Sequence, residues 1–453
     1  MNTPAVPATA TPDHRRVWQL AWPIMLSNLS IPLMGAVDTA ILGHLPSPQY
    51  LGAVAIGASI LSLLFWSFGF LRMGTTSLTA RLTGAGDDSG CRLVLAQSAI
   101  LALLLAALIV ATGPWLIPLA LKLMNPSAEV AALAQSYGQI RLFSAPASLM
   151  NFALIGWFIG RQDTRRPLAI LVTVNGLNIA LDALLILGLG LNSDGAAWAS
   201  VLAEYGGLAL GLVLLRGMLK GMEGRLDRPQ LRHWHRYRGL LQVNRHLFVR
   251  TLCLLLVFAF FAAQGARLGD SVLAANAILL QFLMLTSYAL DGFAHAAEAL
   301  AGRAIGARQL DQFIAATRLT SVWALIFAGL IALVFTLGAP WLPGLFTELD
   351  AVLALVREYY VWVCLLPLIG VWGYQLDGIF LGSGHTGAMQ YTVLASALGV
   401  FLPAWWALQP WGNQGLWLAF VLFNGARGLL LGAVFWHLTR TGRWIQGRTF
   451  IAK

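Results

Sequence analysis

Apolar stretches of about 20 residues recur along the whole chain, and they constrain its fold more than any other feature. A helix of about 20 residues is long enough to cross the hydrocarbon core of a bilayer, where it satisfies its backbone hydrogen bonds internally. Charged residues make up 11% of the chain, whereas soluble proteins contain about 25%. We therefore expect an all-α integral membrane protein.

A hydropathy window predicts twelve transmembrane helices. Their approximate ranges are 17–42, 51–80, 94–121, 132–160, 167–189, 195–217, 241–268, 272–301, 314–342, 354–382, 388–408 and 414–438. The longest polar connection, residues 216–245, divides these spans into two groups of six and so predicts two lobes. The predicted regions are a disordered cytoplasmic tail (1–16), an N-lobe (17–217), a cytoplasmic linker (218–240), a C-lobe (241–438) and a basic cytoplasmic tail (439–453).

Lysine and arginine residues indicate the orientation of these helices. Apart from Lys122, both residue types are nearly absent from the connections 43–50, 122–131, 190–194, 269–271, 343–353 and 409–413. The other connections and the C-terminal tail are rich in arginine, and basic loops remain in the cytoplasm. We therefore expect a multi-pass protein of a bacterial cytoplasmic (inner) membrane with both termini in the cytoplasm. The net charge of +10 then reflects topology and contact with anionic membrane lipids, and we expect no nucleic-acid partner.

The two predicted lobes share an internal repeat. A shift of 222 residues aligns "TARLTGA" (79–85) with "AGRAIGA" (301–307), and "GWFIGRQDT" (156–164) with "GIFLGSGHT" (378–386). Three further residues of each half align at nearly the same offset only if the halves are duplicated, as Gly195 does with Gly415. Because each copy contains an even number of spans, the lobes should be pseudo-symmetric about an axis along the membrane normal, with a central cavity between them.

Six acidic residues lie inside predicted spans, where each costs about 2.5 to 3.5 kcal/mol on insertion scales. They are Asp38, Asp182, Glu204, Asp291, Glu298 and Asp377. Asn178 and Asp182 are four residues apart and share one helix face. Pro23 and Pro32 lie on the helix of Asp38, and each permits a bend. A titratable group on a bendable helix is typical of an ion-sensitive switch.

Each acid also has a purely structural interpretation. Asp38 could bond to neighbours near the outer interface, and Asn178 with Asp182 could be a polar pair that joins two helices. Glu204 could pair with Arg141 instead of joining a polar site. In the second half, Asp291, Glu298 and Asp377 could form a second polar site. Alternatively, Asp291 and Asp377 could be neutralised by the two arginines Arg427 and Arg250.

The stretch "VDTAILGHL" (37–45) and the "LGAVAIGASI" that follows it resemble the DinF-like branch of the multidrug and toxic compound extrusion (MATE) family. The segments 144–167, "YALDGFAHAAEA" (288–299) and "LDGIFLG" (376–382) share this resemblance. It implies a secondary active antiporter that exports cationic or amphipathic organic compounds in exchange for H⁺ or Na⁺ by alternating access. In contrast to the NorM-like branch, the seventh span contains no carboxylate, which disfavours a sodium site in the second lobe.

The resemblance also implies which residues bind the coupling ion. It places the family's cation site on Asp38, Asn178, Asp182 and Ser200, and the bend of the first helix at Pro23. We add Glu204 to this site on its predicted depth. We expect Asp38 and Asp182 to act as one coupled proton-binding pair whose neutralisation repacks the first helix and expels the substrate.

A wide apolar cavity with methionine and aromatic side chains would suit organic cations. The candidate lining residues are Phe65, Trp66, Met73, Met150, Phe152, Met284 and Tyr288, although such residues also serve as packing or lipid-facing groups. We expect a monomer that needs no cofactor and binds no metal other than a coupling ion.

Two other functions compete with this interpretation. A flippase for a lipid-linked oligosaccharide, from the same superfamily, would need a strongly cationic cavity, yet few arginines lie within the spans. An intramembrane enzyme would need clustered catalytic groups, but the histidines are scattered and no HExxH, GxSxG or P-loop pattern occurs. We therefore expect a transporter and not an enzyme.

Overall fold

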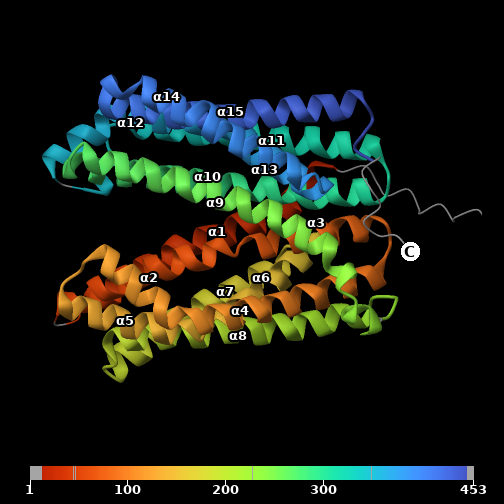
Figure 1. Ribbon diagram of the computed structural model, residues 1–453, viewed down its shortest axis with the longest axis horizontal. Coiled ribbons are helices and arrows are strands. Elements are labelled where there is room, and N and C mark those ends of the chain that lie inside the picture. The colour runs from red at the N-terminus through yellow and green to blue at the C-terminus, as the bar shows by residue number, and fades with distance from the viewer. Residues whose placement is uncertain (1–12, 44, 46, 227, 348, 446–453) are drawn as a thin grey trace, which may run out of the picture. The chain divides into compact units, whose positions relative to one another are not determined.

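The computed structural model describes residues 13–43, 45, 47–226, 228–347 and 349–445, and in these residues all regular secondary structure is helical. The predicted tail residues 1–12 and 446–453 lie outside the described residues. The α-helices, most of them labelled in Figure 1, are α1 (His14–Gly43), α2 (Pro48–Ser67), α3 (Phe70–Gly84), α4 (Asp88–Met124), α5 (Ala128–Leu142), α6 (Ala145–Gly160), α7 (Arg165–Asp182), α8 (Asn192–Lys220), α9 (Arg238–Arg267), α10 (Asp270–Gly306), α11 (Leu310–Gly338), α12 (Asp350–Ser383), α13 (Thr386–Ser396), α14 (Leu402–Ala407) and α15 (Gly412–Arg440).

The helices account for the twelve predicted spans. Within the described residues, ten helical segments are long and apolar enough to cross a membrane, and α5 with α6 forms an eleventh that is bent by 52°. The 30-residue helix α1 occupies the position of the first predicted span. The second span consists of α2 and α3, which are separated by a short break. The all-α membrane fold predicted from the sequence is therefore confirmed.

Two spans contain a π-helical segment at matching places in the two halves. η1 (Ala183–Gly188) follows α7 in the fifth span, and η5 (Ala397–Phe401) follows α13 in the eleventh. A π-helical turn inserts an extra residue into a helix and is frequent at functional sites. The first of these segments begins directly after Asp182.

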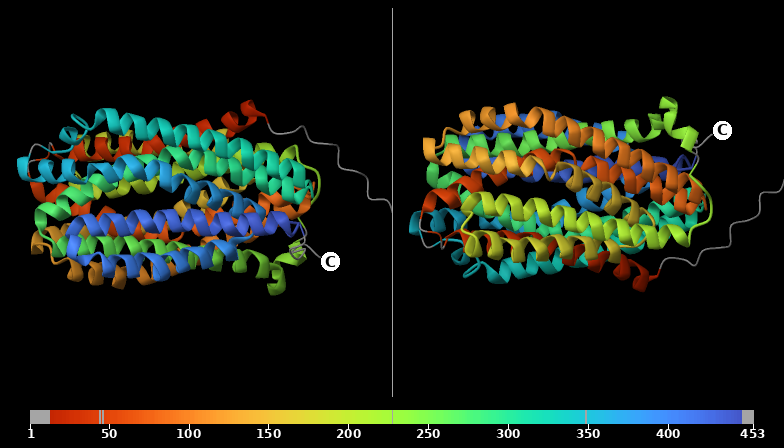
Figure 2. Two further views of the ribbon diagram at one scale, coloured as in Figure 1. Left: turned by 90° about the horizontal axis from the view of Figure 1, so that it is seen from above. Right: turned by 90° about the horizontal axis from the view of Figure 1, so that it is seen from below.

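The chain forms two compact units. The N-unit contains Leu26–Thr79 and Asp87–Leu240, and the C-unit contains Met1–Met25, Ala80–Gly86 and Leu241–Lys453. In the N-unit, α8 packs against α5, α6 and α7, while α2 packs on α5. In the C-unit, α12 is central and packs against α10, α11 and α15. The long helices of each unit run roughly parallel to one another (Figure 2).

The packing repeats in the two units. In the N-unit, Gly156 of α6 lies against the backbone carbonyl of Arg72 on α3. In the C-unit, Gly378 of α12 lies against the carbonyl of Ala294 on α10. Both glycines and both carbonyls are 222 residues apart, the offset found in the sequence. A Cβ at either glycine would overlap the carbonyl oxygen, so these small residues allow two helices to approach closely.

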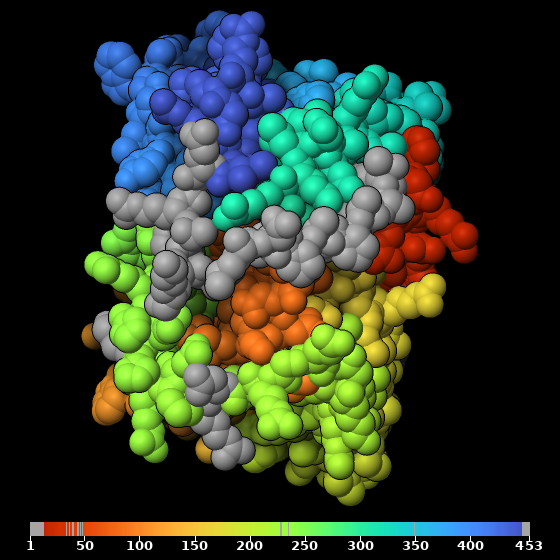
Figure 3. Space-filling model, turned by 90° about the vertical axis from the view of Figure 1, so that its right-hand side faces the viewer, coloured from red at the N-terminus to blue at the C-terminus, as the bar shows by residue number. Residues whose placement is uncertain are grey.

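The polar segment between α8 and α9 packs on the N-unit. It contains two 3₁₀ turns, η2 (Arg228–Arg232) and η3 (Trp234–Tyr237). Arg92 of α4 donates hydrogen bonds to the carbonyls of Leu219 (2.7 Å) and Met222 (3.0 Å). Figure 3 shows this yellow-green segment beside the orange start of α4. The described part of the predicted linker is therefore anchored to α4 by backbone hydrogen bonds.

Candidate ion-coupling site

The N-unit brings together two acids that are 144 positions apart in the sequence, Asp38 and Asp182. Asp38 lies near the end of α1 and is half-buried. Asp182 is the last residue of α7 and is 1% exposed. The two side chains are close enough for a direct hydrogen bond. The structure thus places both acids of the predicted coupling pair side by side.

The hydrogen bonding of this pair depends on a proton. Among the described residues, no donor lies within hydrogen-bond distance of either oxygen of Asp182 or of Asp38 Oδ1. Ionised carboxylates only accept hydrogen bonds, so Asp38 and Asp182 can bond to each other only when one of them is protonated. A small cation between the carboxylates would satisfy the same oxygens. The pair therefore suits either H⁺ or a small cation.

Polar contacts of α7 hold this site in place. Asn178 lies one turn before Asp182 and donates from Nδ2 to Ser200 Oγ on α8, at 3.2 Å. Asn175, one turn earlier, donates to Ser30 Oγ on α1. One face of α7 therefore contacts α1 at Ser30, α8 at Ser200 and Asp38 at its C-terminal end. The predicted residues Asp38, Asn178, Asp182 and Ser200 all contribute to this group of contacts.

Arg141 of α5 is a member of the site that sequence reasoning missed. Its guanidinium interacts electrostatically with both Asp38 and Asp182, and with the buried hydroxyl of Tyr137. Arg141 Nη1 also donates to Ser144 Oγ at 3.2 Å, at the bend between α5 and α6. In the sequence it was considered only as a partner of Glu204. A lone arginine inside an apolar span is itself a signal of a buried acid nearby.

Glu204 of α8 has a different partner from the one considered. Asn151 Nδ2 on α6 donates to Glu204 Oε2 at 3.0 Å and to the Glu204 carbonyl at 3.1 Å. The carboxylate is therefore tied to α6. Its participation in the coupling site stays a prediction.

The helix that carries Asp38 belongs to both units. The division falls between Met25 and Leu26, two residues after the buried Pro23. On the C-unit side, Trp18 packs edge-on against Phe293 of α10 with ring centroids 5.6 Å apart. The predicted hinge at Pro23 therefore lies close to the position at which α1 passes from one compact unit to the other.

The three acids of the predicted second polar site have separate partners in the C-unit. Asp377 of α12 forms ion pairs with Arg250 of α9 and Arg427 of α15. Glu298 Oε2 lies 2.8 Å from His295 Nδ1. Asp291 is half-buried and interacts electrostatically with Tyr288 and Tyr374. For Asp377, the structure supplies the two arginines that the structural interpretation named.

Comparison with known proteins identifies the family. The MatE family model matches residues 23–184 and 247–406, which begin in α1 and α9 and so follow the two halves of the repeat. The chain belongs to the MatE family. Proteins of this family are transporters and not enzymes, and they need no cofactor.

Individual relatives agree with this assignment to the MatE family. The chain is 42% identical over 444 residues to DNA damage-inducible protein F of Escherichia coli (strain K12), a match that covers 96% of this chain and 95% of the relative. It is 25% identical over 445 residues to multidrug resistance protein PmpM of Pseudomonas aeruginosa, covering 93% and 92% of the two chains. The structure of a multidrug resistance MATE family transporter in an outward-facing conformation matches the fold with a TM-score of 0.82, at 21% identity, over 96% of this chain and 97% of that chain.

The candidate cavity residues of this MatE transporter differ in exposure. Phe65 is buried and lies 6.0 Å below the Arg141 guanidinium, whereas Trp66 is 53% exposed. The others are half-buried: Met73, Met150, Phe152, Met284 and Tyr288. Phe65 thus contacts a residue of the ion site, and the role of all seven in substrate binding stays a prediction. Within the described part of the transporter, no group of three His, Cys, Asp or Glu side chains could hold a metal ion.

Proposed function

We propose that this MatE transporter exports cationic or amphipathic organic compounds in exchange for H⁺, with Na⁺ as the alternative coupling ion. The observation that carries the proposal is the adjacent pair of Asp38 and Asp182, which come from different helices and lack protein donors among the described residues. The printed name of the relative from Pseudomonas aeruginosa, a multidrug resistance protein, supports the substrate class.

The physical basis of coupling is the repulsion within this pair. Two like charges about 4 Å apart repel each other by about 4 kcal/mol at an effective dielectric constant of about 20. Binding of H⁺ or Na⁺ removes this repulsion and adds a bond across α1 and α7. The two helices are then drawn together, and α1 adjusts near Pro23, where a missing backbone donor permits a bend.

Exchange follows if ion and substrate favour opposite states. A ligand shifts a conformational equilibrium only by its difference in affinity for the two states. We propose that the ion-bound pair favours the state that releases substrate, and that the ionised pair favours the state that binds it. Alternating access of the lobes to the two sides of the membrane then converts the ion gradient into export.

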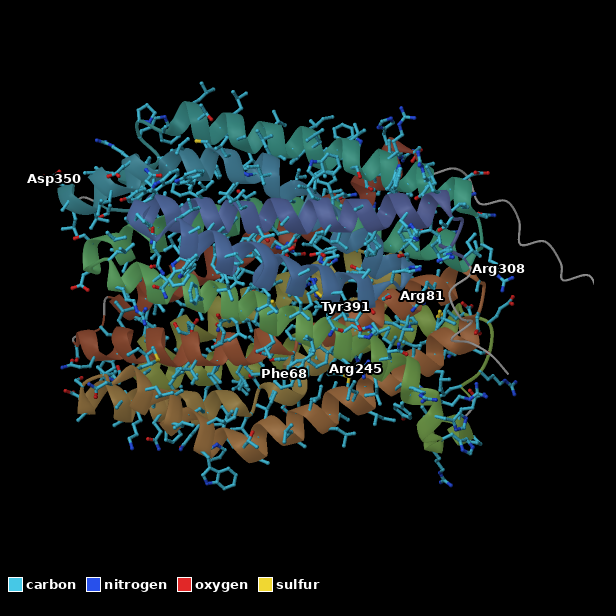
Figure 4. The ribbon with its side chains drawn as sticks, turned by 45° about the horizontal axis from the view of Figure 1, so that its top comes forward. Phe68, Arg81, Arg245, Arg308, Asp350 and Tyr391 are labelled. Atoms are coloured by element: carbon cyan, nitrogen blue, oxygen red, sulfur yellow. The ribbon has the colours of Figure 1, made fainter. Side chains whose placement is uncertain are left out.

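We propose that the transporter lies in a bacterial inner membrane with both termini in the cytoplasm. Within the C-unit, Arg81 and Arg308 lie towards one end and Asp350 lies at the opposite end (Figure 4), a charge distribution that supports this orientation. We further propose a monomer whose basic connections contact anionic lipid headgroups.

Transport by the purified protein tests the proposal. Proteoliposomes loaded with a fluorescent organic cation are exposed to an imposed pH gradient or, separately, to an imposed Na⁺ gradient. We expect the pH gradient to drive transport. Transport driven only by Na⁺ would assign Na⁺ as the coupling ion. A lack of transport under both gradients would contradict the proposal and favour a flippase of the same superfamily.

A further inference from the structure

The C-unit contains a buried cluster of three charges that the proposed coupling mechanism does not use. Arg427 Nη2 of α15 donates to Asp377 Oδ2 at 2.8 Å, and Arg250 Nη2 of α9 donates to the same oxygen. The three residues are only 8% (Arg250), 7% (Asp377) and 6% (Arg427) exposed. Three different helices of the C-unit thus meet at one carboxylate.

The two arginines have different surroundings. Arg427 lies over the ring of Phe423 at 5.7 Å, and its Nη1 lies 3.5 Å from Asn424 Oδ1. Both of these neighbours are on the helix of Arg427 itself. The recorded hydrogen-bond partner of Arg250 is Asp377, which lies 127 positions away in the sequence. The position of the Arg250 guanidinium therefore depends on the carboxylate.

The charge of the cluster opposes binding of a further cation. Asp377 is one negative charge beside two arginines, so the cluster alone has a net charge of +1. Arginine stays protonated in proteins, so neither guanidinium can lose its charge. Each repulsion between a guanidinium and an incoming cation weakens binding by more than about a hundredfold at a separation of about 4 Å.

The coupling pair of the N-unit has the opposite charge balance. There, Asp38 and Asp182 are two acids beside the single cation Arg141. The first cluster can accept a cation, whereas the second already contains its cations in covalent form. The two halves of the repeat therefore differ in the property that decides ion binding.

We propose that Arg250 is the residue that determines ion specificity in the C-unit. Its guanidinium is a resident cation on Asp377, and it confines the exchangeable ion to the Asp38–Asp182 pair. This inference rests on the proposed function in that it concerns which lobe carries the transported ion.

Direct measurement of Na⁺ binding tests this role. Binding of radioactive Na⁺ to the purified full-length protein is measured at neutral pH in choline buffer, together with the Na⁺-dependent rise in Tm. Arg250→Glu changes the net charge of the cluster from +1 to −1. We expect this variant to bind Na⁺ at least about a hundredfold more tightly than the wild type does at Asp377. We expect Arg250→Glu combined with Asp377→Asn to lose the gain.

Two control variants separate charge from packing. Arg250→Lys keeps a positive charge, and we expect no gain of Na⁺ binding. Arg357→Gln removes an exposed arginine from the helix that carries Asp377, and we expect wild-type behaviour. A folded Arg250→Glu protein that gains no Na⁺ binding would contradict the proposal.

The wild-type protein provides a second test that does not require the Arg250 variant to fold. Wild-type Na⁺ binding that is lost in Asp377→Asn but kept in Asp38→Asn would overturn the inference. Gradient-driven transport by Asp38→Asn is measured in parallel, because it tests the proposed function alone. Intact transport by Asp38→Asn would refute the coupling mechanism without changing the Na⁺ binding expected at position 377.

Discussion

At the scale of single residues, His385 should make stability depend on pH. It lies in the turn between α12 and α13, outside the membrane-spanning segments. Burial and the Arg81 guanidinium lower the pKa of this imidazole from its ordinary value of 6.5, while a backbone hydrogen bond at Ser383 opposes the shift. The unfolded chain therefore takes up a proton at higher pH than the folded protein does. Stability is present in full above pH 6.5 and falls as the pH is lowered.

We expect His385→Gln to reduce the loss of Tm between neutral and mildly acidic pH. The measurement is thermal unfolding of the purified protein across this pH range. His437→Gln, which removes an exposed histidine at the end of α15, is the matched control and should behave like the wild type. Equal pH dependence of the His385→Gln protein and the wild type would contradict the account.

A second residue-scale prediction concerns the hydrogen bond between Asn178 and Ser200. Asn178→Ala removes the donor to Ser200 and should lower the free energy of unfolding by about 1 kcal/mol. Because α7 also carries Asp182, we expect ion-driven transport to fall more than binding of the substrate does. Ser200→Ala should have a smaller effect in both assays. Non-additivity in the double variant measures the contact directly, and full additivity would argue against it.

The residue scale also marks the limit of sequence reasoning. The lone acid of the first span, the face shared by Asn178 and Asp182, and the absence of a carboxylate in the seventh span are all readable from the sequence. The contact of Arg141 with both acids is not, because it depends on how three separate helices are rotated about their axes. The partner of Glu204 was missed for the same reason.

At the scale of helices, the sequence predicts where spans lie better than where they break. All twelve spans have a helical counterpart. The break between α2 and α3, the 52° bend between α5 and α6, and the π-helical segments η1 and η5 were not predicted. A hydropathy window averages over about 19 residues, so it does not respond to a change in hydrogen bonding over one turn.

A close contact between α3 and α10 gives a prediction at this scale. Within the C-unit, Gly84 lies against the Arg303 carbonyl and Gly306 lies against the Arg81 carbonyl. These are the residues that the 222-residue repeat aligns, so the contact is reciprocal. Gly84→Leu would place a side chain where the carbonyl lies, and overpacking of this kind costs about 1 to 3 kcal/mol. We expect this variant to separate the ends of the two helices.

Cysteine accessibility measures this separation. A cysteine introduced at Ala80, which lies in the same contact, should react faster with a polar maleimide in the Gly84→Leu background. Gly329→Leu on α11 is the control, because nothing lies within 4 Å of a Cβ at that glycine. Equal reactivity in both backgrounds would show that the glycine is not needed for the contact.

At the scale of the whole molecule, the duplication is the main result that the sequence already contained. The repeat found at an offset of 222 residues reappears as the same glycine-to-carbonyl contact in each unit. The chemistry of the two units has nevertheless diverged. The N-unit has two acids that share one arginine, and the C-unit has one acid between two arginines. Charge balance, and not the fold, therefore distinguishes the two halves.

The most direct test of this account is transport by the Asp38→Asn protein under an imposed pH gradient. In proteoliposomes, the wild type should move a fluorescent organic cation against its concentration gradient. Asp38→Asn should lose this uphill transport and keep downhill exchange of the same substrate, because Asn cannot bind the proton that drives the cycle. Uphill transport by Asp38→Asn at the wild-type rate would contradict the central claim that the Asp38–Asp182 pair couples ion entry to export.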